Sequence, residues 1–155
     1  MVKVRVKGVA MPDSDSMPMV VLEEENGGGS VVVGVGAYEA GAIIMELEGV
    51  STPRPLTHVL MAQLFEEQGL RLRRVELYGV YGQGDDGYLA RIEYGKGLHR
   101  WTRDVRPSDA LALAATTKAP VYAHSSLLAS PEECWPVAGL MEHPESGYWY
   151  AQGGR

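Results

Sequence analysis

Two nine-residue segments of the chain, 35–43 and 105–113, follow one pattern without a gap. Each begins with the valine that ends a strand-like run, carries an acidic residue four positions later, and continues as Ala-x-Ala. The two acidic residues are Glu39 and Asp109. Because a strand leads into a helix in both segments, we predict an internal duplication of a strand–helix–strand unit. Such units pack as an α+β fold, with one mixed β-sheet and helices mainly on one face.

The periodicity of apolar side chains assigns most of the chain to strands or helices. Helices are predicted where apolar residues recur every three or four positions, and strands where they alternate with polar ones. The second helix has Thr57 as its predicted N-cap, an apolar face that includes Leu60 and Leu64, and Gly69 as its end. Strands are predicted over 2–6, 17–22, 30–35, 72–81, 88–94, 98–105 and 121–123, and helices over 40–47, 57–68, 107–117 and, as a short capped turn, 130–133.

Composition places the chain among single-domain globular proteins. Its 155 residues are 45% hydrophobic and 22% charged, which is typical of a soluble domain. We predict one domain over residues 1–135 and a loosely ordered tail over 136–155. No apolar run approaches the ~18 residues of a membrane span, and residues 1–10 show no signal-peptide pattern. Cys134, the one cysteine, has no disulfide partner within the chain, so the cytoplasm is the expected location.

The net charge of −6 argues against one way of binding nucleic acid. Proteins that rely on backbone electrostatics are usually basic, because their affinity comes from neutralising phosphates. A chain with this charge needs either a local basic patch or metal ions between its carboxylates and the phosphates. DNA or RNA as a partner is therefore compatible with the composition but not indicated by it.

Residues 82–87 match the Gly-x-Gly-x-x-Gly pattern of dinucleotide-binding proteins. That pattern needs a helix after it, because the helix N-terminus holds the pyrophosphate. Here a predicted strand follows, and Asp85 and Asp86 would repel phosphate. The segment is therefore predicted to be a hairpin turn. No other motif in the sequence indicates an organic cofactor.

Two related motifs place an arginine before a proline at a helix start. They are Arg54-Pro55-Leu56-Thr57-His58 and Arg106-Pro107-Ser108-Asp109. An arginine beside free helix N–H groups favours an anion such as phosphate. Equally, each arginine could pair with a carboxylate such as Glu39 or Asp104 and tie the two halves together. His58 stands at a helix N-terminus, which favours a neutral ring that can accept a proton, although a structural hydrogen bond explains the same position.

Three acidic residues accompany these motifs: Glu39, Asp104 and Asp109. The helix dipole stabilises a carboxylate in the first turn by about 0.3–1 kcal/mol, which explains Glu39 and Asp109 without any ligand. Alternatively, the three carboxylates could hold a hard divalent ion, Mg²⁺ or Mn²⁺, which needs few protein ligands. The pattern alone favours the dipole.

Five short motifs follow one another along the chain: Glu39-Ala40-x-Ala42-Ile43, Leu47-x-Gly49, Arg54-Pro55-x-Thr57-His58, Asp104-x-Arg106-Pro107-Ser108-Asp109-Ala110-x-Ala112-Leu113-Ala114 and Ala119-Pro120-Val121-Tyr122. Together, over about residues 2–130, they resemble the bifunctional nuclease domain family. The resemblance implies an α+β fold with an internal duplication, cleavage of DNA and RNA, and a homo-oligomer, dimer or higher. Where the family usually has Asp after Thr-His, this chain has Val59, which removes one candidate metal ligand or base partner.

Two functional hypotheses follow. In the first, the chain is a nuclease: the three carboxylates hold a divalent ion, Arg54 and Arg106 bind the phosphate, and His58 activates water or protonates the leaving oxygen. In the second, it is a non-catalytic homo-oligomeric scaffold or a small-anion-binding module, with the same motifs in structural roles. The nuclease hypothesis predicts that both arginines, His58 and Asp109 surround one open cleft. The scaffold or anion-binding hypothesis predicts that the same four side chains are buried and paired with one another or with other groups.

Overall fold

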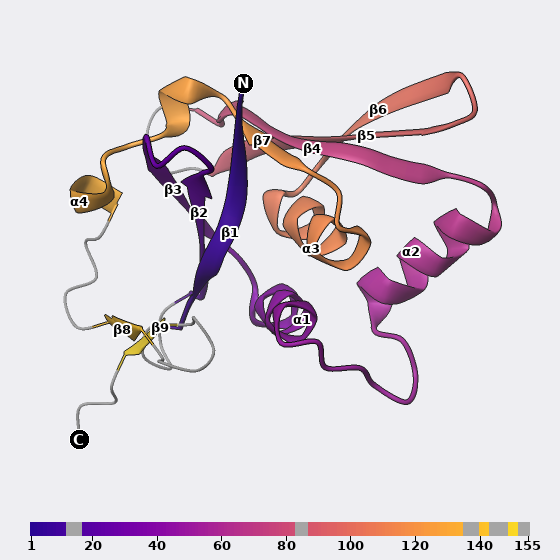
Figure 1. Ribbon diagram of the computed structural model, residues 1–155, viewed down its shortest axis with the longest axis horizontal. Helices are drawn as coiled ribbons and strands as arrows, with labels where there is room; N and C mark the ends of the chain where they lie inside the picture. Colours follow the sequence, from indigo (N-terminus) through magenta and orange to yellow (C-terminus); the bar gives the residue numbers. More distant parts are fainter. Residues whose placement is uncertain (12–16, 83–86, 135–139, 143–148, 152–155) are drawn as a thin grey trace.

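The computed structural model describes residues 1–11, 17–82, 87–134, 140–142 and 149–151 (Figure 1). Its strands are β1 (Val2–Met11), β2 (Met19–Glu24), β3 (Ser30–Gly34), β4 (Arg71–Val80), β5 (Tyr88–Lys96), β6 (His99–Val105), β7 (Val121–Ala123), β8 (Leu140–Glu142) and β9 (Trp149–Ala151). Its helices are α1 (Ala37–Leu47), α2 (Thr57–Glu67), α3 (Pro107–Thr117), the 3₁₀ turn η1 (Ser125–Leu127) and α4 (Pro131–Cys134).

Seven strands form one mixed sheet in the order β3-β2-β1-β7-β4-β5-β6. Neighbours in that order are antiparallel, except for β7 and β4, which are parallel. β9 pairs with β1 in parallel and with β8 in antiparallel orientation. The prediction of an α+β fold with a mixed sheet is confirmed. β6 ends the sheet on one side, and in the described part of the chain its outer edge has no strand partner.

The helices α1, α2 and α3 lie on the same side of the sheet, with α3 between the other two (Figure 1). α3 is rich in small residues, and its side chains from Ala110 to Ala114 are all buried. It packs against β4 and β5 as well as both other helices. The core lies between this helical layer and the sheet, and its largest fully buried side chains include Leu22, Ile43, Leu77 and Leu111.

Each half of the chain has three antiparallel strands followed by a helix, β1–β3 with α1 and β4–β6 with α3. In both halves the helix begins two residues after the aligned valine, at Ala37 after Val35 and at Pro107 after Val105. This order of elements is compatible with the predicted repeat. It does not confirm a duplication, which stays a prediction.

α2 differs from its prediction in two ways. Thr57 is its first residue and not its N-cap, and Leu56, which takes the cap position, makes no side-chain cap. The expected apolar face is not buried, because Leu60, Met61 and Leu64 are 45%, 41% and 50% exposed. The physical reason is that α2 lies at the end of the helical layer, where α3 packs against its inner side.

The strands on either side of the glycine-rich segment confirm that it is a hairpin turn. Val80 pairs with Tyr88 across β4 and β5, and the N–H of Tyr81 donates to the carbonyl oxygen of Gly87. Residues 83–86 of the turn lie outside the described residues. The predicted tail, 136–155, contributes β8 and β9, and the remainder of it also lies outside them. In the described part of the chain, every helix is too short or too polar to cross a membrane.

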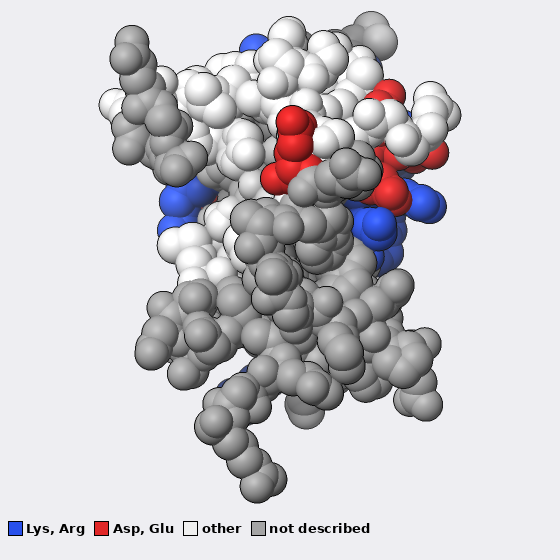
Figure 2. Space-filling model, turned by 90° about the vertical axis from the view of Figure 1, so that its left-hand side faces the viewer, with Lys and Arg blue, Asp and Glu red and all other residues white. Residues whose placement is uncertain are grey.

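The cations of β1 are compensated by nearby carboxylates. Lys3 pairs with Glu25 at 3.0 Å, and Arg5 and Lys7 pair with Glu23 at 3.4 and 3.5 Å. Figure 2, a view onto the left-hand side of Figure 1, likewise shows acidic and basic side chains beside one another. Positive charge on the N-terminal strands is therefore already paired within the chain.

Candidate functional site

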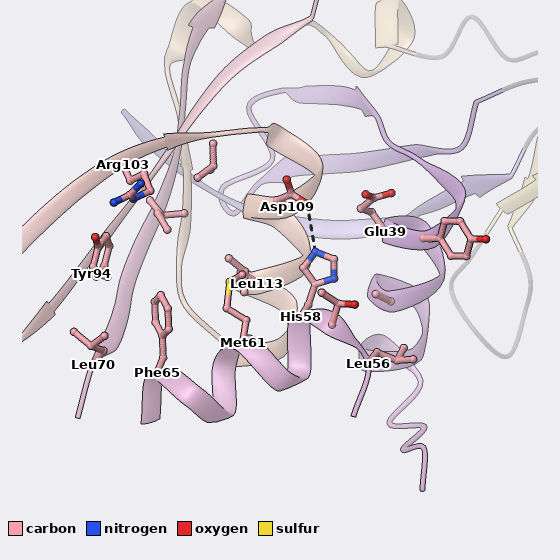
Figure 3. Close-up of a pocket in the computed structure, with 15 residues that line it drawn as sticks. Glu39, Leu56, His58, Met61, Phe65, Leu70, Tyr94, Arg103, Asp109 and Leu113 are labelled. Carbon is pink, nitrogen blue, oxygen red and sulfur yellow. Dashed lines mark hydrogen bonds and ion pairs between the residues drawn. The ribbon is translucent and has the colours of Figure 1, made fainter. Parts of the chain in front are cut away.

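A cavity of about 720 Å³ lies between α2 and the sheet, and α1 and α3 complete its walls (Figure 3). Its lining is mostly apolar, with a few polar groups. A cavity of this size and character is typical of a ligand site. The apolar lining includes Met61, Phe65, Ile92 and Leu113, and the charged or titratable residues in it include Glu39, His58, Arg103 and Asp109.

Three helix N-termini converge on one end of this cavity. Glu39 is the third residue of α1, His58 is the second residue of α2, and Asp109 is the third residue of α3. Side chains in a helix point back toward its N-terminus, so neighbouring helix starts can bring such groups together. The helix starts that the sequence singles out therefore share one cavity.

Arg106 links two of these groups. Its Nε donates to Asp109 Oδ2 at 2.7 Å and its Nη2 donates to Asp109 Oδ1 at 2.9 Å, which makes a bidentate pair. The same Nη2 lies 3.3 Å from Glu39 Oε1, so the arginine joins the two halves of the chain. The side chain is nonetheless 69% exposed, and Nη1 makes no hydrogen bond to the described residues. Arg106 is thus both paired with carboxylates and accessible to an anion.

His58 joins the group through Asp109. Its Nε2 lies 3.4 Å from Asp109 Oδ1, the contact marked by the dashed line in Figure 3. An ionised carboxylate can only accept, so the neutral ring carries its proton on Nε2. Nδ1 then keeps a free lone pair, and it has no hydrogen-bond partner among the residues described. An imidazole held in this tautomer by a carboxylate can accept a proton at its other nitrogen.

Asp109 is held in its ionised form. The hydrogen bonds from the Arg106 guanidinium lower the pKa of Asp109, burial opposes this shift, and the contact with His58 adds to it. The same carboxylate raises the pKa of Arg106. Asp109 therefore remains an acceptor for the imidazole across the neutral pH range.

Two residues predicted for the site lie apart from the other four. Asp104 accepts a hydrogen bond from Tyr78 Oη at 3.1 Å. Successive residues of a strand face opposite sides of the sheet, and Arg103 lines the cavity, so Asp104 points to the other face of β6. Arg54 is exposed in the loop between α1 and α2 and is not part of the cavity lining. The remaining four come together at the three helix starts.

The three carboxylates that could together hold a divalent ion do not lie around one point in the structure. In the described part of the chain, no three His, Cys, Asp or Glu side chains are placed to hold an ion together. Both oxygens of Asp109 already accept from Arg106, which also pairs with Glu39. Asp104 faces away. A requirement for Mg²⁺ or Mn²⁺ therefore stays a prediction, as does the expectation of no organic cofactor.

Val59 occupies the position at which this chain departs from the family it resembles. It follows His58 on α2 but lines neighbouring hollows and not the cavity. Consecutive helix residues are turned by about 100°, and the hollows that Val59 lines are not lined by Asp109. The valine therefore removes no carboxylate from the group around His58.

The residues at the other end of the cavity are not predicted from the sequence. Tyr94 and Arg103 come to it from the β5–β6 hairpin, and Phe65 comes from α2. Tyr94 pairs with Trp101, and Ile92 pairs with Arg103, so these side chains share one face of the hairpin. The signal that could have found them is the mixture of basic and aromatic residues over 94–103, combined with the strand register.

Comparisons with known proteins identify a family and several relatives. A family model described as "Bifunctional nuclease domain" matches residues 20–133, a region that contains all four residues of the group. An uncharacterized protein of Mycobacterium tuberculosis (strain H37Rv) is 31% identical over 144 residues, 93% of this chain and 80% of that protein. A protein of strain CDC 1551 gives the same 31% identity. Bifunctional nuclease 2 of Oryza sativa subsp. japonica is 24% identical over 122 residues, 78% of this chain and 38% of that protein.

Proposed function

Because the chain belongs to the bifunctional nuclease domain family, we propose that it hydrolyses phosphodiester bonds in DNA, RNA or both. The observation that supports this proposal best is the imidazole of His58, oriented by Asp109 at one end of a cavity. Arg106 is exposed and pairs with Asp109 just outside the cavity lining. Phosphodiester hydrolysis needs a proton acceptor for water and a cation for the phosphate, and this group contains both. The cytoplasm remains its expected location.

In the proposed mechanism, His58 Nδ1 takes a proton from the attacking water as the water oxygen bonds to phosphorus. Asp109 stabilises the resulting imidazolium, and Arg106 donates through Nη1 to a non-bridging phosphate oxygen. The P–O bond to the leaving group breaks, and the imidazolium returns the proton to the leaving oxygen. The ring ends neutral, and the products are a phosphate monoester and an alcohol.

A cleavage assay tests this proposal, with Asp109→Asn protein purified identically as the control for contaminating nucleases. The substrates are single-stranded DNA, duplex DNA and RNA. Wild type is expected to cleave at least one of them. Asp109→Asn is expected to be slower by about 10- to 100-fold, because an amide no longer holds the imidazole in one tautomer. Equal cleavage by the two proteins would exclude this site.

Metal dependence is measured in the same assay, with Mg²⁺, Mn²⁺ or EDTA. Glu39 and Asp109 carry two negative charges against one on Arg106, so the site resists an approaching phosphate unless the phosphate comes from the exposed side of the arginine. Cleavage that survives EDTA means that the described side chains suffice. Cleavage that needs an added ion means that an ion joins the substrate phosphate to one or two carboxylates of the site.

A second candidate function is a non-catalytic homo-oligomeric scaffold or small-anion-binding module. The observation that favours assembly is the exposed apolar side of α2, where Leu60 and Leu64 lie outside the cavity lining. Exposed apolar patches of this kind mark interaction surfaces. We therefore propose a homo-oligomer, dimer or higher, whose contact includes α2. Assembly of this kind is compatible with either function.

Leu64→Glu is expected to lower the sedimentation coefficient of the oligomer to that of a monomer, because a carboxylate in an apolar contact loses its hydration. The matched control is Leu98→Glu, at a residue that is 94% exposed in the turn between β5 and β6. The control should sediment like wild type. A wild-type protein that is monomeric at micromolar concentration would contradict the assembly.

A further inference from the structure

The β5–β6 hairpin carries a row of stacked rings next to the cavity. Tyr94 and Trp101 face each other across the two strands, with ring centroids 5.7 Å apart and planes 28° from parallel. His99 stacks on Trp101 at 6.0 Å and 15°, and Phe65 of α2 lies 5.7 Å from Tyr94. Trp101 is still 43% exposed, so part of its ring can receive another flat group.

The same hairpin is a basic part of an acidic chain. Residues 94–103 contain Lys96, Arg100 and Arg103 and no Asp or Glu, whereas the whole chain carries a net charge of −6. Arg103 is exposed and lines the cavity, and it forms no ion pair with the described carboxylates. On the face that carries Tyr94 and Trp101 the hairpin therefore supplies two cations for a nucleic-acid partner, Lys96 and Arg103, whereas Arg100 lies on the opposite face. The cations of β1, in contrast, are compensated.

One continuous surface joins the hairpin to the helix starts. Tyr94 and Trp101 form one cross-strand pair on the cavity side, and Ile92 and Arg103 form the next pair on that side. Such neighbours on one strand are about 6.6 Å apart, roughly the step of one extended nucleotide. Figure 3 shows Arg103 and Tyr94 at one end of the cavity and His58 toward the other, with apolar side chains between them.

We infer that this surface binds an unpaired nucleic-acid strand, with one base stacked on Trp101 and a neighbouring phosphate on Arg103. The inference rests on the proposed function and names the form of its substrate, a single strand that crosses the hairpin toward His58. Aromatic side chains stack on any base, and basic side chains along the groove neutralise the backbone. In a duplex the base faces are hidden in the duplex's own stack, so only its phosphates can use this surface.

A second copy of the chain is the competing occupant, because β6 is an edge of the sheet. A two-fold contact between hairpins would place the cations of 94–103 in one copy against the same cations in the other. This segment holds no carboxylate to compensate them, and like charges across an interface oppose association. The charge of the hairpin therefore suits phosphates better than a second hairpin.

The test measures binding and not cleavage. Fluorescence anisotropy in EDTA compares a labelled oligothymidylate with a labelled DNA duplex, for wild type and for variants whose circular dichroism matches it. Trp101→Ala is expected to weaken single-strand binding by about 5- to 150-fold, and Trp101→Phe to restore most of the loss, because phenylalanine still stacks. Arg103→Gln should reduce the slope of log K against log salt by about 0.7. Leu98→Ala, in the same hairpin, should bind like wild type.

Two results would overturn the inference. One is equal single-strand affinity of wild type, Trp101→Ala and Arg103→Gln. The other is a Trp101→Ala protein that loses its oligomeric state in sedimentation and keeps its affinity, since the hairpin would then be a subunit contact. Trp101→Phe and Arg103→Gln keep the test decisive if alanine at 101 prevents folding. The cleavage assay tests the proposed function, and the anisotropy measurements test the single-strand surface. Because binding is measured separately from cleavage, failure of one can be distinguished from failure of the other.

Discussion

Replacing His58 by alanine is expected to lower kcat for phosphodiester cleavage by about 10²- to 10⁴-fold, the usual contribution of a positioned acid–base group. Nε2 of this ring contacts Asp109, and Nδ1 is the atom that accepts the proton from water in the proposed mechanism. Alanine removes both nitrogens. KM is expected to change little, because the ring acts mainly in the transition state. Initial rates over a range of substrate concentrations separate the two constants.

Val59→Ala is the matched control for this experiment. Val59 is the next residue of α2 and lies outside the cavity lining, so its truncation disturbs the same helix start without touching the imidazole. Its kcat should stay close to that of wild type. Equal rates for wild type and His58→Ala would refute the assignment. Parallel losses in both variants would attribute the effect to the helix and not to the ring.

Some ends of the helices that carry the site can be predicted from sequence, because local chemistry determines them, whereas the predicted start of α1 at residue 40 is three residues too late. Pro107 is the first residue of α3, where a missing N–H costs nothing. Gly49 and Gly69, just after α1 and α2, have φ of +66° and +69°, a backbone conformation that favours glycine. These signals act within a few residues, so no knowledge of the tertiary fold is needed to interpret them.

The contacts within the site cannot be predicted in the same way, because they join residues far apart in the sequence. His58 and Asp109 are 51 positions apart, and Arg106 and Glu39 are 67 positions apart. The sequence marks each of them as a candidate on its own helix. Only the packing of α1 and α2 against α3 decides that the candidates meet.

The alternation of side chains along β6 explains why Asp104 lies apart from the other candidate metal ligands. Along β6, Arg103 lines the cavity and Asp104 bonds Tyr78 on the opposite face. A shift of one residue in strand register would exchange them, and the sequence of β6 does not show which face will be covered. The same limit applies to α2, because periodicity identifies an apolar face but not what packs against it.

Leu111→Ala is expected to lower the free energy of unfolding by about 2–5 kcal/mol, the usual cost of a fully buried leucine. Leu111 has 0% exposure and belongs to α3, the helix that packs against α1, α2 and the sheet. Its neighbours Ala110 and Ala112 have no rotamers with which to fill the space left behind. Urea unfolding followed by circular dichroism measures the change.

The control for this variant is Leu98→Ala, because Leu98 is 94% exposed. The same chemical change at that surface position should alter stability by no more than about 0.5 kcal/mol. Leu111 also lies two residues after Asp109 on α3, so the residual activity of Leu111→Ala should follow its folded fraction if packing alone holds the carboxylate in place. Equal unfolding midpoints for the two variants would mean that α3 is not the centre of the core. The meeting of Asp109 with His58 would then need a different physical cause.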